Sequence, residues 1–168
     1  MSIAVRIEPA SASPGEVEYR WDPDTDILTA NIRDRAPSPG GGSASVEIEG
    51  RDGSWLVLDL AAGQISGVEV AVWPDVRKRA TLNPPTNATD AMVVIPSAPD
   101  GGEVTAIEMN TAVSAEADFA ERTFHFTLGP SREIRTVRIA REILLDLDLR
   151  DRIAGVWLLD VPPFPVEQ

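Results

Sequence analysis

Residues 143–159, ILLDLDLRDRIAGVWLL, combine the clearest strand pattern of the chain with three aspartates within six positions. Apolar residues recur at every second position from Ile143 to Leu149, and Asp146 and Asp148 lie between them. Because successive side chains of a strand point to opposite faces, such alternation is typical of a half-buried strand. The pattern predicts that the leucines are buried and that both aspartates face solvent.

The aspartates could alternatively hold a metal ion or act as catalytic acids. Asp146 and Asp148 are two residues apart, so both carboxylates could face one cation. A calcium loop, however, needs a flexible backbone with a glycine and a distal bidentate acid. Here leucines intervene, and Gly155 lies inside the next strand. We therefore interpret the segment as a strand, a hairpin turn at Asp151 and a second strand, with no metal ligand and no catalytic residue.

Two other polar features are weak signals of function. The stretch 21–27, WDPDTDI, has the aspartate spacing that opens an EF-hand loop, but Ile27 and Arg33 occupy the positions that need glycine and glutamate. It predicts a turn between strands. His125, the single histidine, lies on the polar face of an alternating segment at 123–128. We expect it to be exposed and without a catalytic role.

Composition narrows the classes of function. The chain has 168 residues, 43% of them hydrophobic, no cysteine and a net charge of −12. An acidic surface repels phosphate backbones, which argues against nucleic-acid binding. The N-terminus lacks a basic start followed by an apolar run, and no apolar stretch is long enough to span a bilayer. We expect a soluble cytoplasmic protein without a cofactor, which binds neither nucleic acid nor membrane.

Short segments of the chain recur at a spacing of about 88 residues. They predict two β repeats, at 1–79 and 91–168, joined by a connector at 80–90 that contains Pro-Pro and several polar residues. The matching segments are 5–9 and 93–96, 14–17 and 101–104, 55–60 and 143–147, and 65–68 and 153–156.

The alternation extends over most of the chain and predicts about twelve short strands. Helical turns are expected only at 75–80 and 115–122. The predicted fold is therefore mainly β, with two β-meander repeats related by a pseudo-twofold axis. We expect them to pack as one domain, as a sandwich or in a barrel-like form.

Aromatic residues carry the clearest binding signal. Trp157 and Glu69 occupy equivalent places in the two repeats, so the two faces are expected to meet different surroundings. The proline-rich segment 161–166 cannot continue a strand ladder, and could cover a sheet edge or dock in an aromatic groove of a partner. We predict that Trp157 and Phe164 form the joint between the repeats or, alternatively, a homodimer contact. The predicted binding residues are Trp157, Phe164, Glu69 and Trp73.

The segments at 19–28 (YRWDPDTDIL), 57–60 (VLDL) and 63–70 (GQISGVEV) resemble a family of small bacterial domains of unknown function. Its pattern is Tyr-Asp-Pro-x-x-Asp-Ala-Leu, then Leu-Asp-Leu-Asp-x-x-Gly-x-Ile-Val-Gly-Ile-Glu-Ile. The similarity covers about 19–79, and the second repeat matches only at 143–159. There Trp157 replaces the glutamate and Asp151 the turn glycine. The resemblance implies a compact β-meander without an established activity. Some members neighbour toxin-like proteins, which implies an antitoxin role.

Together these features favour a non-enzymatic binding or accessory protein that acts through protein–protein contacts. One alternative is an antitoxin-like inhibitor that uses its acidic surface against a small basic protein. Another is a carboxylate-based hydrolase, which a deep pocket with a strongly raised carboxyl pKa would favour.

Overall fold

The computed structural model describes residues 3–10, 13–33, 43–96 and 105–165, and within them all regular structure is β. The mainly β fold class is thus confirmed. The two expected helical turns are wrong, because these segments form strands β7 (Val76–Arg79) and β10 (Val113–Asp118) that pair with each other in parallel. Pairing across the sheet overrides local propensity here.

The described residues form fourteen strands, and their order along the chain alternates hairpins with longer connections. The remaining strands are β1 (Arg6–Pro9), β2 (Val17–Trp21), β3 (Leu28–Ile32), β4 (Ser43–Glu49), β5 (Trp55–Ala61), β6 (Gln64–Val72), β8 (Thr89–Val94), β9 (Thr105–Asn110), β11 (Phe124–Leu128), β12 (Ile134–Ala140), β13 (Ile143–Asp148) and β14 (Ile153–Leu158). The stretch at 21–27 forms the turn between β2 and β3, as predicted.

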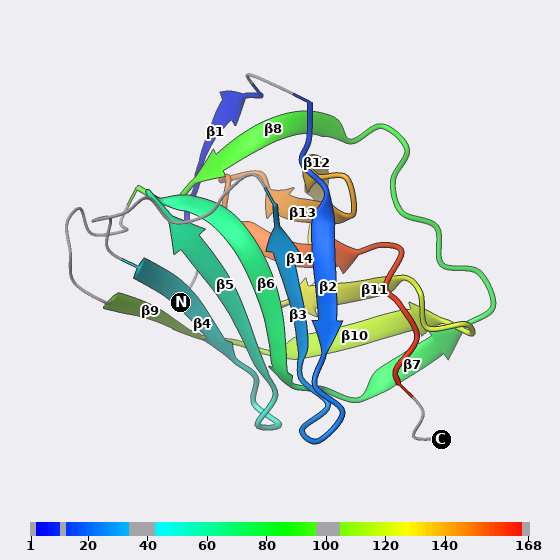
Figure 1. Cartoon of the computed structure of the whole chain (residues 1–168). Coiled ribbons are helices and arrows are strands. Elements are labelled where there is room, and N and C mark those ends of the chain that lie inside the picture. Colours follow the sequence, from blue (N-terminus) through cyan, green and yellow to red (C-terminus); the bar gives the residue numbers. More distant parts are fainter. Residues whose placement is uncertain (1–2, 11–12, 34–42, 97–104, 166–168) are drawn as a thin grey trace.

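One arrangement of five strands occurs twice in the sheet. The order β2-β3-β6-β5-β4 in the first half matches β10-β11-β14-β13-β12 in the second. Figure 1 shows the two groups facing one another, with β8 curving between them at the top. Each group therefore has an inner face toward the shared core and an outer face.

The central hairpins of the two groups share one register. Asp59 on β5 lies opposite Gly67 on β6, and Asp146 on β13 lies opposite Gly155 on β14. A bulge follows each aspartate. Common register and strand order are what a duplication would leave, and the duplication itself stays a prediction. Of the segments that suggested it, 101–104 lies outside the described residues.

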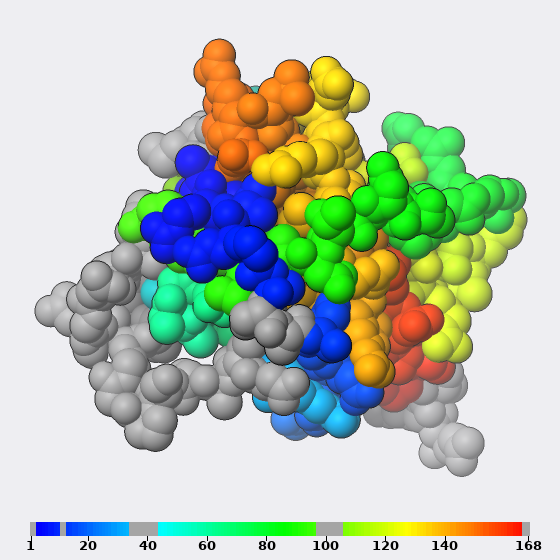
Figure 2. Space-filling view, turned by 90° about the horizontal axis from the view of Figure 1, so that it is seen from above, coloured from blue at the N-terminus to red at the C-terminus, as the bar shows by residue number. Residues whose placement is uncertain are grey.

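Strands also cross between the halves. β9 pairs in parallel with β4, β7 with β10, and β1 pairs antiparallel with β8. β8 begins at Thr89, inside the predicted connector 80–90, so 1–79 and 91–168 share one continuous sheet. Seen from above, the blue N-terminal segment lies against the orange turn between β13 and β14 (Figure 2), where Val5 N donates to Asp151 O at 2.8 Å.

The core lies between the inner faces, and Leu145 and Leu147 are buried there as predicted. The solvent-facing positions expected for Asp146 and Asp148 are wrong, because these residues are only 1% and 4% exposed. The reason is that all residues of β13 and β14 are buried, so the outer face of this hairpin is covered as well. The groups that cover it come from β11, β12 and the loop between them.

Candidate functional site

Asp146 is the centre of a hydrogen-bonded cluster on the outer face of the second half. One carboxylate oxygen, Oδ2, lies 2.7 Å from His125 Nε2. The other, Oδ1, accepts from Thr136 Oγ1 at 2.7 Å and from Trp157 Nε1 at 3.3 Å. A buried carboxylate is costly unless it is hydrogen-bonded, and these donors meet that requirement.

His125 and Trp157 lie opposite one another on β11 and β14, and their rings stack with centroids 3.9 Å apart. The expectation of an exposed histidine is therefore wrong, since its side chain is only 18% exposed and contacts Asp146. Gly155 makes room for this cluster. A Cβ there would lie 2.6 Å from Asp146 Oδ2 and 2.7 Å from Phe126 O, closer than atoms normally approach.

Asp148 organises the hairpin turn that follows β13. Its Oδ1 accepts from the backbone N–H groups of Arg150 and Arg152, at 2.9 and 3.0 Å. Its Oδ2 accepts from Nε of Arg132 and of Arg152, at 3.1 and 3.0 Å. Burial raises the pKa of Asp148, but these N–H groups and the guanidinium charges outweigh burial and lower the pKa to about 2.

This lowered pKa predicts a specific acid sensitivity. The unfolded chain has an aspartate pKa near its ordinary value of about 3.9. Asp148 therefore stabilises the fold above about pH 4, and that contribution is lost as the pH falls toward about 2. We expect the midpoint urea concentration to decrease as the pH is lowered from 5 to 2. The decrease should be less steep for Asp148→Ala. Equal slopes for the two proteins would contradict this assignment.

The described residues contain no group of three or more His, Asp or Glu side chains that could hold a metal ion. Both carboxylate oxygens of Asp146 and both of Asp148 already have side-chain or backbone hydrogen-bond partners. We therefore expect calcium to leave the melting temperature unchanged. A ligand that binds the native state raises stability in proportion to RT ln(1 + [L]/Kd). A clear rise during a calcium titration would show that the hairpin is a cation site.

A pocket of about 140 Å³ opens beside the Asp146 cluster. His125 and Asp146 lie in its wall, together with Ser131 and Arg132 of the loop before β12. Arg132 is held in place, since its guanidinium also donates to the carbonyls of Leu128 and Pro130, both at 2.9 Å. The pocket thus brings a histidine–carboxylate pair to the surface.

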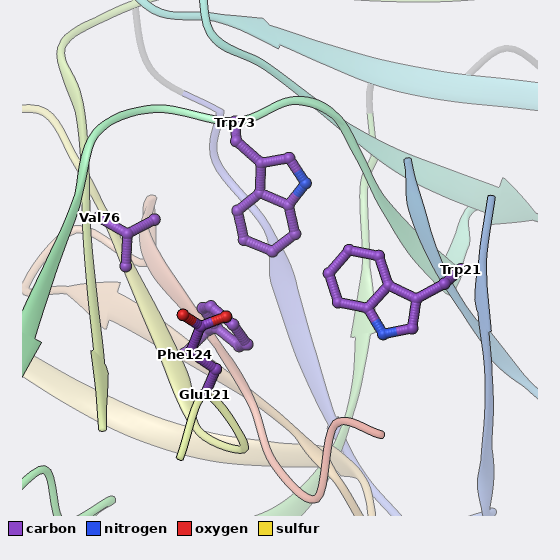
Figure 3. A pocket seen from close by; sticks show the side chains of 5 residues that line it. All are labelled: Trp21, Trp73, Val76, Glu121 and Phe124. Carbon is purple, nitrogen blue, oxygen red and sulfur yellow. The ribbon is translucent and has the colours of Figure 1, made fainter. Parts of the chain in front are cut away.

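A second pocket, of about 160 Å³, lies where β2, the start of β7 and the turn before β11 meet. Figure 3 shows that the side chains of Trp21, Trp73, Val76, Glu121 and Phe124 surround it. We call these five residues the aromatic pocket.

Ring contacts hold the aromatic pocket together. Trp21 and Trp73 stack with centroids 5.6 Å apart, and Trp73 also packs on Phe124 at 5.1 Å. Trp73 Nε1 donates to Asp26 O at 2.7 Å, which fixes the direction of the indole. At the rim, Glu121 forms an ion pair with Lys78, the single lysine of the chain. Aromatic walls with a charged rim are typical of a recognition site.

The structure separates the four predicted binding residues into three places. Trp73 lies in the aromatic pocket, and Phe164 forms a T-shaped ring pair with Trp21, with centroids 5.2 Å apart. Trp157 instead belongs to the Asp146 cluster and is 6% exposed. Glu69 lies at the corresponding position of the first half, where burial and then the carboxylate of Asp59 raise its pKa.

Sequence reasoning missed three residues of the aromatic pocket. The sequence predicted no binding role for Trp21, Phe124 or Glu121. Their assembly depends on chain segments about 100 residues apart, for which a single sequence has no local signal. The alternation of Tyr19 and Trp21 on β2 was the one usable hint, because it places both aromatic side chains on one face.

No protein-family model matches this chain, and neither does any curated protein. The resemblance to the family of small bacterial domains therefore stays a prediction. Within the described residues, no helix has the length and apolar character needed to cross a membrane.

Proposed function

We propose that the protein is a non-enzymatic binding protein, which acts in the cytoplasm by contacting a protein partner through the aromatic pocket. The observation that carries this proposal is the pocket itself. Trp21, Trp73 and Phe124 present large, mutually packed rings around an open volume of about 160 Å³. Tryptophans in such a setting contribute most of the binding energy of many protein interfaces.

Charge favours a basic partner over an acidic one or a nucleic acid. The chain carries a net charge of −12. Such a surface attracts basic proteins over a distance and speeds their association. An antitoxin-like inhibitor of a small basic protein is one form that this function could take.

Affinity capture from the host lysate tests the proposal when variants are compared. Trp73→Ala removes a pocket wall, and Glu121→Arg reverses the rim charge. Trp55→Ala is the matched control, because Trp55 is 41% exposed on β5 and does not line the pocket. A partner that the native chain and the control retain, and that both pocket variants lose, supports the proposal. A partner retained by all four proteins would reject it.

One observation favours a second candidate, a hydrolase. The contact of 2.7 Å between His125 and Asp146 would orient the ring as a general base beside the pocket that contains Ser131. The test is turnover of an ester panel by the native chain, by His125→Gln and by the control Asp59→Asn. Turnover lost only in His125→Gln would support hydrolysis, and turnover independent of His125 would reject it.

A further inference from the structure

The C-terminal segment 159–165, LDVPPFP, lies beside β2 and contacts it through side chains. Among the described strands β2 pairs with β3 alone. Prolines at 162, 163 and 165 have no amide hydrogen, so this segment cannot add a regular strand to β2. A different set of contacts must therefore hold the segment there.

Two aromatic side chains of β2 supply these contacts. Tyr19 donates its hydroxyl hydrogen to Leu159 O at 2.7 Å, and Trp21 Nε1 donates to Pro162 O at 2.8 Å. The ring of Phe164 then meets Trp21 edge to face, with centroids 5.2 Å apart and planes at 81°. Such edge-to-face pairs contribute beyond the area they bury.

The segment bends between these two bonds, because Asp160 has a positive φ of 53°, and the prolines that follow restrict their own φ to the range of extended backbone. The donors lie two residues apart on one face of a strand, and the acceptors lie three residues apart in the segment. Burial, then the carboxylates of Glu142 and Asp160, raise the pKa of Tyr19, so its hydroxyl remains a donor at neutral pH.

We propose that the Tyr19–Trp21 face of β2 is a recognition site for a proline-containing segment of a protein partner, and that residues 159–165 occupy it in cis. This inference rests on the function proposed above, because it names the chemistry of the partner. Trp21 also lines the aromatic pocket, so a bound segment would continue directly into that pocket. Proline-rich ligands suit such a site because they are already extended and lose little entropy on binding.

The segment is anchored at one buried residue and is exposed beyond it. Val161 is fully buried, and its N–H bonds to Arg122 O at 2.9 Å, so it anchors the segment. Beyond it, Pro163 and Pro165 are exposed and Phe164 is 38% exposed. A tethered competitor of this kind acts at an effective concentration near the millimolar range. The native chain should thus bind a partner segment more weakly than a chain with a loosened tail.

The test uses a fluorescent peptide of sequence LDVPPFP and the full-length chain, with binding followed by anisotropy. In the double variant Pro162→Gly/Phe164→Ala, we expect the peptide to bind at least 10-fold more tightly than to the native chain. Adding Trp21→Phe, which removes the N–H donor, should reverse this gain by 10-fold or more, whereas adding Trp55→Phe should not. A peptide with alanines in place of the prolines should bind at least 10-fold more weakly.

Several outcomes would overturn the proposal. One is a variant that keeps its native melting temperature but does not bind the peptide, and another is binding that Trp21→Phe leaves unchanged. If the double variant does not fold, Phe164→Ala alone gives the same comparison, because that ring is partly exposed. A dimeric mass of the native chain that Phe164→Ala converts to monomer would make a second copy the occupant and overturn the proposal as stated. If capture of a partner depends on Trp73 but the peptide does not bind, the proposed function remains supported. That result would reject a proline-containing segment as the ligand.

Discussion

Replacing Trp157 by alanine is expected to lower the free energy of unfolding by about 3–5 kcal/mol, the usual range for a large buried aromatic residue. The indole is 6% exposed and stacks on His125. Its loss also removes a hydrogen bond to the buried Asp146 carboxylate. Urea denaturation at pH 7 measures the change.

Trp55→Ala is the matched control for this prediction. Trp55 is 41% exposed, so the same substitution there should cost less than about 1 kcal/mol. Because Trp157 is buried within its own chain, we expect its replacement to leave the mass on light scattering unchanged. A native-like melting temperature together with a reduced mass would instead identify Trp157 as a dimer anchor. If neither quantity changed, both interpretations of this residue would be rejected.

Asp148→Ala is expected to cost about 3 kcal/mol, because removing one partner of a buried ion pair leaves the other groups without compensation. The carboxylate accepts from two backbone N–H groups and from the side chains of Arg132 and Arg152. Its removal loosens the hairpin turn and the loop that Arg132 holds. Thermal unfolding at pH 7 measures the loss.

Asp151→Asn provides the comparison within the same turn. Asp151 forms an ion pair with Arg135 at 2.8 Å, but both side chains are at least half exposed. Exposed pairs contribute about 0–1 kcal/mol, and asparagine tolerates the positive φ of 54° at this position. We expect a small loss of stability for Asp151→Asn and a large loss for Asp148→Ala. Similar losses for the two would show that the turn does not depend on the buried carboxylate.

Local alternation was sufficient to predict the strands and the hairpin at 143–159. Leu145 and Leu147 are buried as the two-residue period requires. The period alone could not show that the polar face is covered as well. That cover comes from His125 on β11 and Thr136 on β12, which reach Asp146 through cross-strand pairing. Alternation identifies two faces but does not say what lies against the second.

The strands at 76–79 and 113–118 were missed for a related reason. After Val113, β10 has alanines at its buried positions, and after Val76, β7 is basic, so each has only one of the branched or aromatic residues typical of strands. They form strands because each completes the sheet beside the other. The site residues Trp21 and Phe164 likewise come together only after the C-terminal segment returns to β2.

The side chains of the Asp146 cluster and those of the aromatic pocket differ in what they contact. In the Asp146 cluster, donors and acceptors bind one another, so the aspartates stabilise the hairpin. In the aromatic pocket, Trp21 and Trp73 present ring surface around an open volume. This difference is why we assign recognition to the aromatic pocket and a structural role to the aspartates.

Partner capture by Asp146→Asn and Trp73→Ala, measured side by side below both melting temperatures, tests this assignment most directly. We expect Asp146→Asn to melt at a lower temperature yet retain the partner at the native level, because the aromatic pocket is intact. Trp73→Ala should capture at least 10-fold less partner than the native chain. The reverse pattern, with capture lost in Asp146→Asn and retained in Trp73→Ala, would contradict the assignment and place the functional site at the aspartate cluster.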